Sequence, residues 1–363
     1  MTSDGMLKRL AQRTFRVRRH LHALARYGSP RRYANIAITE AERLLRRDHL
    51  AGRPYILLVD PVNACNLRCP CCPTGRGDLP LKTGKMRLEQ FQALVDQIAP
   101  HTVKMLLYNW GEPFLHKDIL PMIRHAHGHR IATGVSSNLN ILPEGGAEAV
   151  VASGLDDLIV SCDGLEQATY EKYRVRGNVE TVLANMKAIA DAKLRLGRKT
   201  PVIEFQYLVF AHNEHEVNDV ERTARSLGAN FVRLMTPYIN FRESDVRPAT
   251  NPKYRKAFYE DDETEKAKID PFERDADLDA CAAQNPPPLS CFWPWRSIVI
   301  NWNGQVDPCC FKNYHDAFGN AFETPFAEIW NGEVYRDARR WIAGKPLADP
   351  ARRIVCRGCA GYR

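Results

Sequence analysis

The residues with the most evident chemistry in this chain are cysteines, of which there are 11 among 363 residues. A first cluster occupies residues 65–72, where Cys65, Cys69 and Cys72 have the spacing C-x3-C-x2-C. Three close thiolates can hold three irons of a cubic 4Fe–4S cluster and leave the fourth iron open to a ligand. Zinc is the competing metal, but a closed tetrahedral zinc site would need Cys71 as a cramped fourth ligand.

A second cluster lies later in the chain and comprises Cys291, Cys309, Cys310, Cys356 and Cys359. A distant pair combined with C-x2-C is an ordinary zinc arrangement, and four thiolates also close around an iron–sulfur cluster. The adjacent Cys309 and Cys310 leave open which of the two is a ligand. Because no export signal is visible, we expect metal ligation by these thiols rather than disulfides.

The elements that must position these thiols follow from an alternation of short β-rich runs with helical patterns. The predicted strands are residues 55–60, 103–109, 131–136, 157–161, 202–209 and 231–235, and the predicted helices are 86–98, 119–127, 146–153, 179–194 and 214–227. A repeat of about 30 residues predicts a parallel sheet built from βα units. Six units are too few for a closed eight-stranded barrel, so we predict an α/β fold that forms a partial (β/α)6 barrel. Ligands of such folds bind at the carboxyl ends of the strands, where the first cysteine cluster lies.

The net charge of the chain is concentrated at its beginning. Residues 1–50 contain 12 Lys+Arg against 4 Asp+Glu, which equals the whole net charge of +8. Apolar residues at helical spacing predict a basic amphipathic helix from Leu7 to Leu24 and a second helix over residues 38–50. Such helices fit an anionic membrane face or an acidic partner, or they pack on the main domain with solvated arginines.

Other classes of partner and location are disfavoured. The basic helices lack interleaved aromatic residues and a recognisable module, so nucleic acid is not a predicted partner. No apolar run is long enough for a membrane span and no secretion signal is visible, so a cytoplasmic location is expected.

These patterns divide the chain into four predicted parts. Residues 1–53 form a basic helical extension, and residues 54–240 form the partial barrel. Residues 241–285 form a charged connector of part helix and part loop, and residues 286–363 form a small Cys-rich module stapled by metal.

The cysteine triad and the motifs that follow it resemble the radical S-adenosylmethionine (SAM) superfamily. The motifs, each after its own predicted strand, are Trp110-Gly111-Glu112-Pro113, Ser136-Ser137-Asn138 and Ser161-Cys162-Asp163-Gly164, with Arg174 beyond them. The first is similar to the GGEP motif of the family, with Trp110 in place of a glycine. The resemblance implies that backbone carbonyls of residues 110–113 accept the amino group of SAM. It also implies that Ser137, Asn138, Ser161 and Asp163 are polar contacts to the cofactor and that Arg174 pairs with the SAM carboxylate.

The same resemblance implies an activity. The open iron of a cluster held by Cys65, Cys69 and Cys72 would bind the methionine moiety of SAM. An electron from a reductant such as flavodoxin or ferredoxin would cleave the sulfonium bond, and a 5′-deoxyadenosyl radical would remove a hydrogen atom from the substrate.

The second cysteine cluster resembles part of the SPASM domain that is attached to many enzymes of this superfamily. The run Cys291…Gly304-x4-Cys309 is similar to its opening pattern, and only Cys356 and Cys359 remain after it. The resemblance implies a shortened SPASM or Twitch-like module with one auxiliary 4Fe–4S cluster, held by Cys291, Cys309, Cys356 and Cys359.

We therefore predict a radical SAM oxidoreductase whose auxiliary cluster serves electron transfer. The reaction would be a dehydrogenation or a crosslink in a sugar-like, small-molecule or peptide substrate. One alternative is a redox-neutral epimerase in which Cys310 returns a hydrogen atom to the substrate. An alternative of another class is a non-catalytic interaction protein stapled by two zinc sites.

Overall fold

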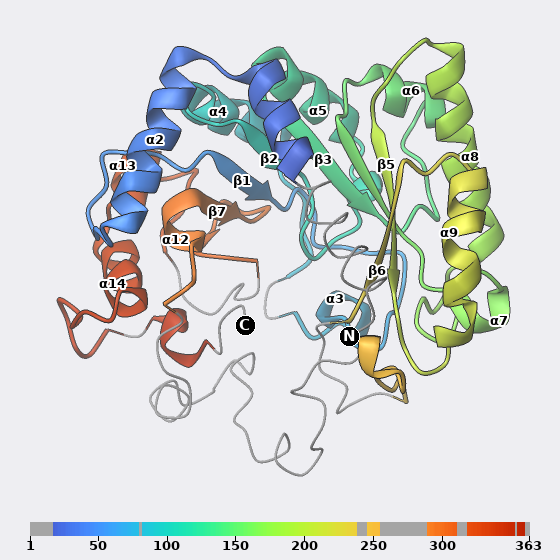
Figure 1. The fold of residues 1–363 in the computed structure, drawn as a ribbon. Helices are drawn as coiled ribbons and strands as arrows, with labels where there is room; N and C mark the ends of the chain where they lie inside the picture. The colour runs from blue at the N-terminus through green and yellow to red at the C-terminus, as the bar shows by residue number, and fades with distance from the viewer. Residues whose placement is uncertain are drawn as a thin grey trace.

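One eight-stranded sheet organises the part of the chain that the structure describes (Figure 1). In this computed structural model the described residues are 17–79, 82–237, 245–254, 289–310, 318–352 and 354–359. The strands are β1 (Ile56–Val59), β2 (Lys104–Leu106), β3 (Ala132–Ser137), β4 (Asp157–Ser161), β5 (Val202–Leu208), β6 (Phe231–Met235), β7 (Ser297–Ile300) and β8 (Val306–Asp307). Their order is β6-β5-β4-β3-β2-β1-β7-β8, in which β8 alone is antiparallel to its neighbour.

The predicted α/β fold with a mostly parallel sheet is confirmed. The helices between the strands are α3 (Pro73–Arg76), α4 (Leu88–Ile98), α5 (Ile119–Gly128), α6 (Gly146–Ala152), α7 (Gln167–Tyr170), α8 (Val179–Arg195) and α9 (Val217–Ser226), with 3-10 turns η1 (Pro113–Leu115) and η2 (Glu214–Glu216). Helices α8 and α9 lie outside the curved sheet next to β5 and β6 (Figure 1). The strand–helix alternation in the sequence therefore predicted the order of these elements correctly.

Strand β5 shows how the sequence divides the two faces of the sheet. Ile203, Phe205 and Tyr207 are fully buried in the main hydrophobic core, which also contains apolar side chains of α8 and α9. Successive side chains of a strand point to opposite faces. Glu204 and Gln206 therefore point to the inner side of the curved sheet, which is the polar side.

The Cys-rich segment continues the barrel sheet instead of building a core of its own. Strand β7 pairs with β1 in parallel, with Leu58 opposite Val299, and all four residues of β7 are buried. Trp330 and Tyr335 belong to the same hydrophobic core as the barrel strands. The helices of this segment are α12 (Trp293–Arg296), α13 (Phe326–Trp330), α14 (Glu333–Ile342) and the 3-10 turn η5 (Val355–Gly358).

The helical beginning of the chain differs from its prediction. Residues 17–27 are helical, and residues 7–16 of the predicted first helix lie outside the described residues. The second helix, predicted over residues 38–50, is instead α2 (Pro30–Leu44), so that prediction was wrong at both ends. Ser29 caps the helix by accepting a hydrogen bond from the Arg32 N–H, and Pro30 occupies the first helical position, which proline favours.

The predicted connector over residues 241–285 lies mostly outside the described residues, which include only 245–254 of it, with the turn η3 (Pro252–Tyr254). Among the helices that the structure describes, none is both long and apolar enough to cross a membrane.

Candidate active site

The first cysteine cluster lies in the loop after β1, at the carboxyl edge of the sheet. Cys65, Cys69, Cys71 and Cys72 pack together in one apolar patch with Leu67, Tyr173, Leu208, Phe210 and Val246. The structure therefore brings the three thiols of the C-x3-C-x2-C spacing together, against side chains that follow β4 and β5. We call these nine residues the cysteine patch.

Burial in the cysteine patch disfavours thiolates unless a positive charge compensates them. Burial raises the pKa of Cys65 to about 11 and that of Cys69 to about 12, while Arg174 opposes both shifts. A metal binds the thiolate, so loading the site releases protons. Three thiols that need positive charge, beside one arginine, form a donor set that suits an iron–sulfur cluster.

The loop after β2 is hydrogen-bonded directly to the cysteine loop. The Glu112 N–H donates to the Ala64 carbonyl at 2.8 Å, next to Cys65. A Cβ at Gly111 would lie 1.7 Å from the Val62 carbonyl oxygen, so only glycine permits this approach of the two loops. The Trp110 N–H donates to Asp60 at 3.2 Å, and the Trp110 carbonyl accepts from Thr74 at 2.7 Å.

The Glu112 carboxylate fastens the loop after β2 to the loop after β3. Its two oxygens accept the N–H groups of Phe114 at 3.1 Å and Asn138 at 2.8 Å. Burial raises the pKa of Glu112 to about 6, while these two N–H groups and Ser137 oppose the shift. Pro113 follows as the first residue of η1. The predicted Trp-Gly-Glu-Pro motif thus positions two loops at the carboxyl edge.

The motif after β3 also reaches the first cysteine. The Asn138 side-chain amide lies 3.7 Å from Cys65 Sγ and donates to Asn66 Oδ1 at 2.9 Å. Ser137 Oγ accepts the Leu139 N–H at 2.9 Å. On the inner side of the sheet, Ser161 Oγ at the end of β4 lies 3.3 Å from the hydroxyl of Ser136.

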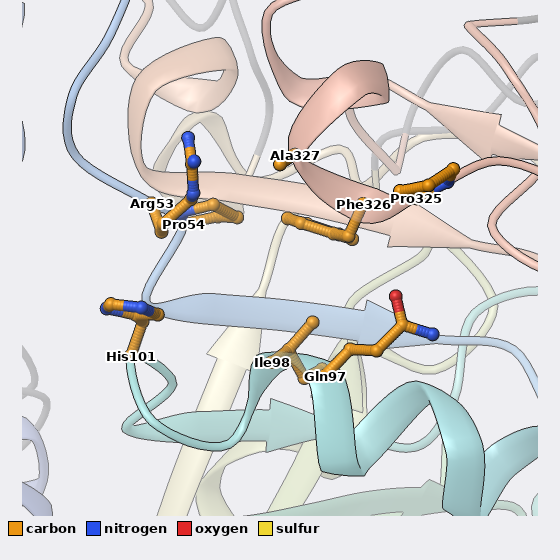
Figure 2. A pocket seen from close by; sticks show the side chains of 8 residues that line it. All are labelled: Arg53, Pro54, Gln97, Ile98, His101, Pro325, Phe326 and Ala327. Carbon is orange, nitrogen blue, oxygen red and sulfur yellow. The ribbon is translucent and has the colours of Figure 1, made fainter.

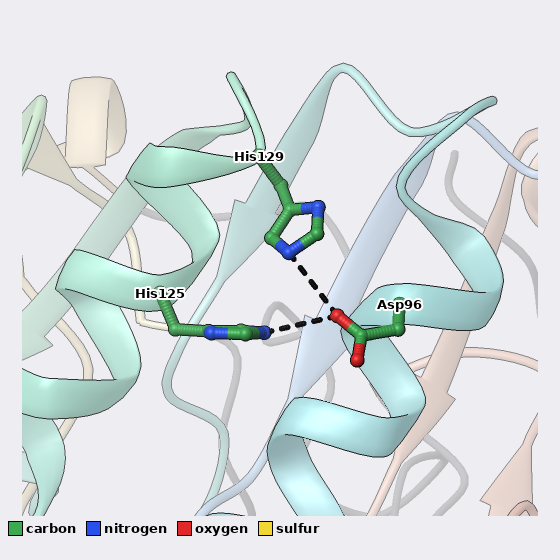
Figure 3. A group of neighbouring side chains, drawn as sticks. All are labelled: Asp96, His125 and His129. Carbon is green, nitrogen blue, oxygen red and sulfur yellow. Dashed lines mark hydrogen bonds and ion pairs between the residues drawn. The ribbon is translucent and has the colours of Figure 1, made fainter.

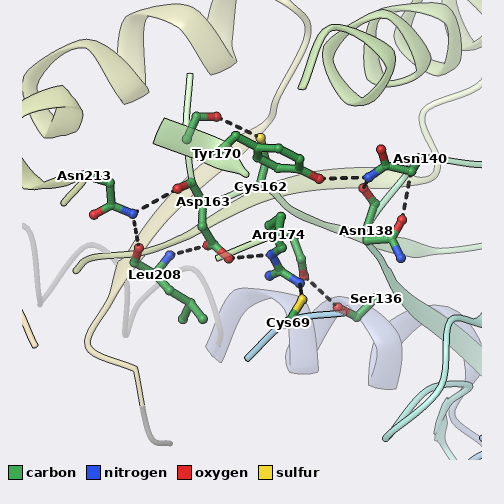
Figure 4. Close-up of polar contacts among 12 residues, drawn as sticks. Cys69, Ser136, Asn138, Asn140, Cys162, Asp163, Tyr170, Arg174, Leu208 and Asn213 are labelled. Carbon is green, nitrogen blue, oxygen red and sulfur yellow. Dashed lines mark hydrogen bonds and ion pairs between the residues drawn. The ribbon is translucent and has the colours of Figure 1, made fainter. Parts of the chain in front are cut away.

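Arg174 links the motif after β4 to the cysteine patch (Figure 4). Its Nε donates to Asp163 Oδ2 at 2.6 Å, and its Nη1 lies 3.9 Å from Cys69 Sγ. Asp163 Oδ1 accepts the Leu208 N–H at 2.7 Å, so both oxygens of this fully buried carboxylate have protein partners. Burial lowers the pKa of Arg174, but Asp163 and Cys69 outweigh burial and hold it well above the usual value.

Four thiols of the second cysteine cluster lie in two neighbouring pairs, Cys291 with Cys359 and Cys309 with Cys356. Burial raises the pKa of Cys291 to about 11 and Cys359 adds to the shift, so these two thiols are within electrostatic reach of each other. Burial also raises the pKa of Tyr335, and Cys309 and Cys356 add to that shift. The Cys359 N–H donates to the Cys356 carbonyl at 3.3 Å, which joins the two pairs.

Cys310 lies within electrostatic reach of a different tyrosine, Tyr108. Burial raises the pKa of Tyr108 to about 12, Arg233 opposes the shift, and Cys310 adds to it. Tyr108 follows β2 and Arg233 lies on β6, so Cys310 is near the polar inner face of the sheet while Cys309 is near Tyr335.

Both parts of the chain match known families. A family model for the radical SAM superfamily matches residues 59–224, and a model for SPASM, an iron–sulfur cluster-binding domain, matches residues 291–360. The chain belongs to the radical SAM superfamily. This radical SAM protein is therefore an enzyme that uses SAM and a 4Fe–4S cluster, and its SPASM domain implies auxiliary iron–sulfur clusters. The non-catalytic zinc protein considered above is excluded.

Curated relatives and solved structures agree with this assignment. The radical SAM chain is 25% identical to AdoMet-dependent heme synthase of Methanosarcina barkeri, over 89% of this chain and 93% of the relative. It is 25% identical to PqqA peptide cyclase of Gluconobacter oxydans, over 78% of each chain. Its fold is similar to that of Streptococcus suis SuiB bound to S-adenosylmethionine, with a TM-score of 0.60 at 13% identity, over 83% of this chain and 69% of that one.

Several residues of the site were not predicted from the sequence. Asp60 ends the β1 segment, is fully buried, and binds the loop after β2; burial raises its pKa to about 7. Asn213 fixes the Asp163 backbone by donating to its carbonyl at 2.9 Å. Tyr173 lies in the cysteine patch, with its ring 5.3 Å from the Arg174 guanidinium. A polar residue at the carboxyl end of a predicted strand was the available signal for Asp60, and adjacency to Arg174 was the signal for Tyr173.

A cavity of about 260 Å³ lies on the opposite edge of the sheet, before β1 and β2 (Figure 2). Its walls come from the loop before β1, the end of α4 and the start of α13, and are formed by Arg53, Pro54, Gln97, Ile98, His101, Pro325, Phe326 and Ala327. No predicted site residue lines this cavity, so it is separate from the candidate active site.

Proposed function

We propose that this radical SAM enzyme oxidises a polar small-molecule, sugar-like or peptide substrate by hydrogen-atom abstraction. The observation that carries the proposal is the convergence of the loops after β1, β2, β3 and β4 on the cysteine patch. Cys65, Cys69 and Cys72 are the proposed ligands of the SAM-binding cluster. When bound, the cluster and SAM supply the radical that removes the hydrogen atom.

Different backbone and side-chain groups around the cysteine patch are proposed to bind different parts of SAM. The proposal assigns the backbone of residues 110–113 to the amino group of SAM, and Asn138 and Ser161 to its other polar groups. Arg174 is the proposed partner of the SAM carboxylate, because its guanidinium is directed from Asp163 toward Cys69. Asp163 then acts as a positioning residue, since both of its oxygens are already used.

The side chains on the inner face of the barrel favour the proposal that the substrate is polar. Arg233 forms an ion pair with Glu204 and donates to Gln206 at 2.6 Å. Tyr108 lies near this group. Side chains of this kind bind hydroxyl, amide and carboxylate groups, because a substrate that fills the space must satisfy their hydrogen bonds.

The second cysteine cluster supports one auxiliary cluster with ligands Cys291, Cys309, Cys356 and Cys359. Such a cluster, fully ligated by protein, suits the electron transfer that an oxidation requires, and a reductant such as flavodoxin or ferredoxin would supply the SAM-binding cluster. The position of Cys310 near Tyr108 favours one second candidate. In a redox-neutral epimerisation Cys310 would return the hydrogen atom to the substrate.

A comparison of the wild type with Cys310→Ala tests the proposal. The iron-replete, reduced wild type should form 5′-deoxyadenosine from SAM. If the reaction is an oxidation, the Cys310→Ala variant should form as much 5′-deoxyadenosine as the wild type and turn over the substrate equally well. Loss of turnover in the variant with 5′-deoxyadenosine still formed would favour the epimerase. No 5′-deoxyadenosine from a wild-type protein with both clusters loaded would contradict the proposed function.

Helix α2 has a face that the enzyme reaction does not use. Its buried side chains are all polar, namely Arg32, Asn35, Thr39 and Glu42. Ile36 packs on a small cluster with Ala23 and Tyr27, but most of the large apolar side chains here are exposed. These are Tyr33, Ile38, Leu44 and the C-cap residue Leu45, the last two being 70% and 65% exposed. An ordinary surface helix shows the reverse arrangement.

Hydrogen bonds fix this orientation of α2. The buried Arg32 guanidinium donates to backbone carbonyls that include Tyr27 at 2.6 Å and Ala99 at 2.7 Å. The Glu42 carboxylate accepts the N–H groups of Ala51 at 2.7 Å and Gly52 at 3.0 Å. Because α2 is held through its polar side chains, most of its large apolar side chains face outward.

We propose that this outward face of α2 contacts an anionic membrane surface. Arg47 is exposed two residues after Leu45, and residues 1–50 carry all the net positive charge of the chain. Exposed leucines flanked by arginines are typical of helices that lie in the interface of anionic lipids. The contact would bring a lipid-associated substrate to the enzyme or hold the enzyme near it.

Sedimentation with vesicles tests this membrane contact. The double variant Leu44→Glu/Leu45→Glu should bind vesicles containing phosphatidylglycerol at least about 10-fold more weakly than the wild type, because two exposed leucines that would enter the lipid interface are lost. Leu194→Glu is the matched control, since Leu194 is 81% exposed on α8, far from α2 in the sequence. Equal sedimentation of all three proteins would contradict the contact.

A further inference from the structure

Three side chains on the outside of the barrel form a group that the radical chemistry does not use. Asp96 lies in the last turn of α4, His125 lies in the last turn of α5, and His129 is the C-cap residue of α5 (Figure 3). His125 Nε2 lies 3.2 Å and His129 Nε2 lies 3.1 Å from the same oxygen, Asp96 Oδ1. All three ligand atoms lie within 4.8 Å of one another.

We propose that Asp96, His125 and His129 bind a divalent transition metal of the zinc class. Histidines four residues apart share one face of a helix, which is the spacing that presents two imidazoles to one metal. Two imidazoles and a carboxylate are common zinc ligands at about 2.0–2.2 Å, so neighbouring ligand atoms of a tetrahedral site lie about 3.4 Å apart. The observed separations of 3.1 and 3.2 Å need only small side-chain shifts to meet this geometry.

The surrounding backbone also favours a cation at this place. Asp96 is in the last turn of α4, which ends at Ile98, and His125 is in the last turn of α5, which ends at Gly128. The carbonyl ends of helices carry partial negative charge and stabilise nearby cations. Because two helix ends meet here, the site combines the charge of one carboxylate with two such ends.

The proposed metal site is remote from the candidate active site. His129 precedes β3 and Asn138 follows it, and the six residues of β3 span about 20 Å. A metal at Asp96, His125 and His129 would join α4 to α5 on the outside of the barrel. The exposed Asp96 side chain leaves room for water to complete the coordination sphere, as in zinc sites with three protein ligands.

Zinc uptake by the holoenzyme tests the site. Protein with both clusters loaded is dialysed against micromolar zinc, and zinc and iron are then measured in the same sample. The wild type should take up about one zinc per chain beyond its iron. His129→Ala and Asp96→Asn should each lose this zinc, whereas His49→Ala, which removes an exposed histidine elsewhere, should retain it.

Iron content and 5′-deoxyadenosine formation serve as the second readout, and both should be the same in all four proteins. If Asp96, His125 and His129 only hydrogen-bond to one another and have no affinity for metal, the wild type should take up no zinc. That result would overturn the proposal. Zinc uptake that is equal in the wild type, His129→Ala and Asp96→Asn also overturns it, because the metal would then be bound elsewhere.

Discussion

Replacing Cys65, Cys69 and Cys72 together by alanine is expected to abolish the formation of 5′-deoxyadenosine and to lower bound iron from about eight to about four atoms per chain. The three thiols share the cysteine patch, and each is required because a cubic cluster held by three thiolates has no spare protein ligand. The remaining iron would belong to the auxiliary cluster of the SPASM domain. The measurements are iron analysis and chromatographic detection of 5′-deoxyadenosine after anaerobic reconstitution.

The matched control for this prediction is Cys71→Ala. Cys71 is buried in the same cysteine patch but lies outside the C-x3-C-x2-C spacing. Its loss removes a thiol of equal size from the same surroundings, so both iron and 5′-deoxyadenosine should stay at wild-type levels. Activity that survives in the triple variant, or iron that falls in the control as far as in the triple variant, would contradict the ligand assignment.

The barrel was predictable because its signals are local. Strand β5 buries one face through Ile203, Phe205 and Tyr207, and each of the strands β1 to β5 is followed by helical segments with their own period. Parallel strands place all their carboxyl ends at one edge. The order of motifs in the sequence therefore predicted that Cys65, Glu112 and Asn138 would lie together, and the hydrogen bonds between their loops agree.

The features that the sequence did not predict depend on contacts between distant residues. Strand β7 joins β1 across more than two hundred residues, and no local pattern in its four buried residues indicates that partner. The bounds of helix α2 were mispredicted because apolar periodicity was the signal used, whereas the helix begins after the Ser29 cap and its buried side chains are polar. Its polar face is buried instead, because backbone carbonyls and N–H groups around it satisfy Arg32 and Glu42.

The different surroundings of Cys309 and Cys310 were also not predictable from the sequence. Spacing alone favoured Cys309 as a cluster ligand, and the adjacent thiols were otherwise equivalent. Their surroundings differ in the folded chain, because Cys309 adds to the raised pKa of Tyr335 and Cys310 adds to that of Tyr108. The direction of a side chain after a two-residue strand depends on how β8 pairs with β7, which is a tertiary property.

Replacing Asp163 by asparagine is expected to destabilise the enzyme by about 3–5 kcal/mol, because it leaves the charge of Arg174 without its buried partner. Asparagine keeps the shape of the side chain and the acceptor for the Leu208 N–H. With its one oxygen on the Leu208 side, asparagine places an NH2 group, which cannot accept, where Asp163 accepts from Arg174 Nε at 2.6 Å. Asp163 is fully buried and the Arg174 side chain is only 13% exposed, so water cannot replace the lost charge.

The apparent urea midpoint of the anaerobic holoenzyme measures this effect. Asp191→Asn is the control, since Asp191 pairs with Lys187 at 2.5 Å on the exposed surface of α8 and such pairs contribute only about 0.5 kcal/mol. The double variant Asp163→Asn/Arg174→Met should recover much of the lost stability, because it removes the unpaired charge together with its partner. If the double variant were less stable than Asp163→Asn alone, the two residues would not act as a pair, and the proposed positioning of Arg174 toward Cys69 by Asp163 would fail with it.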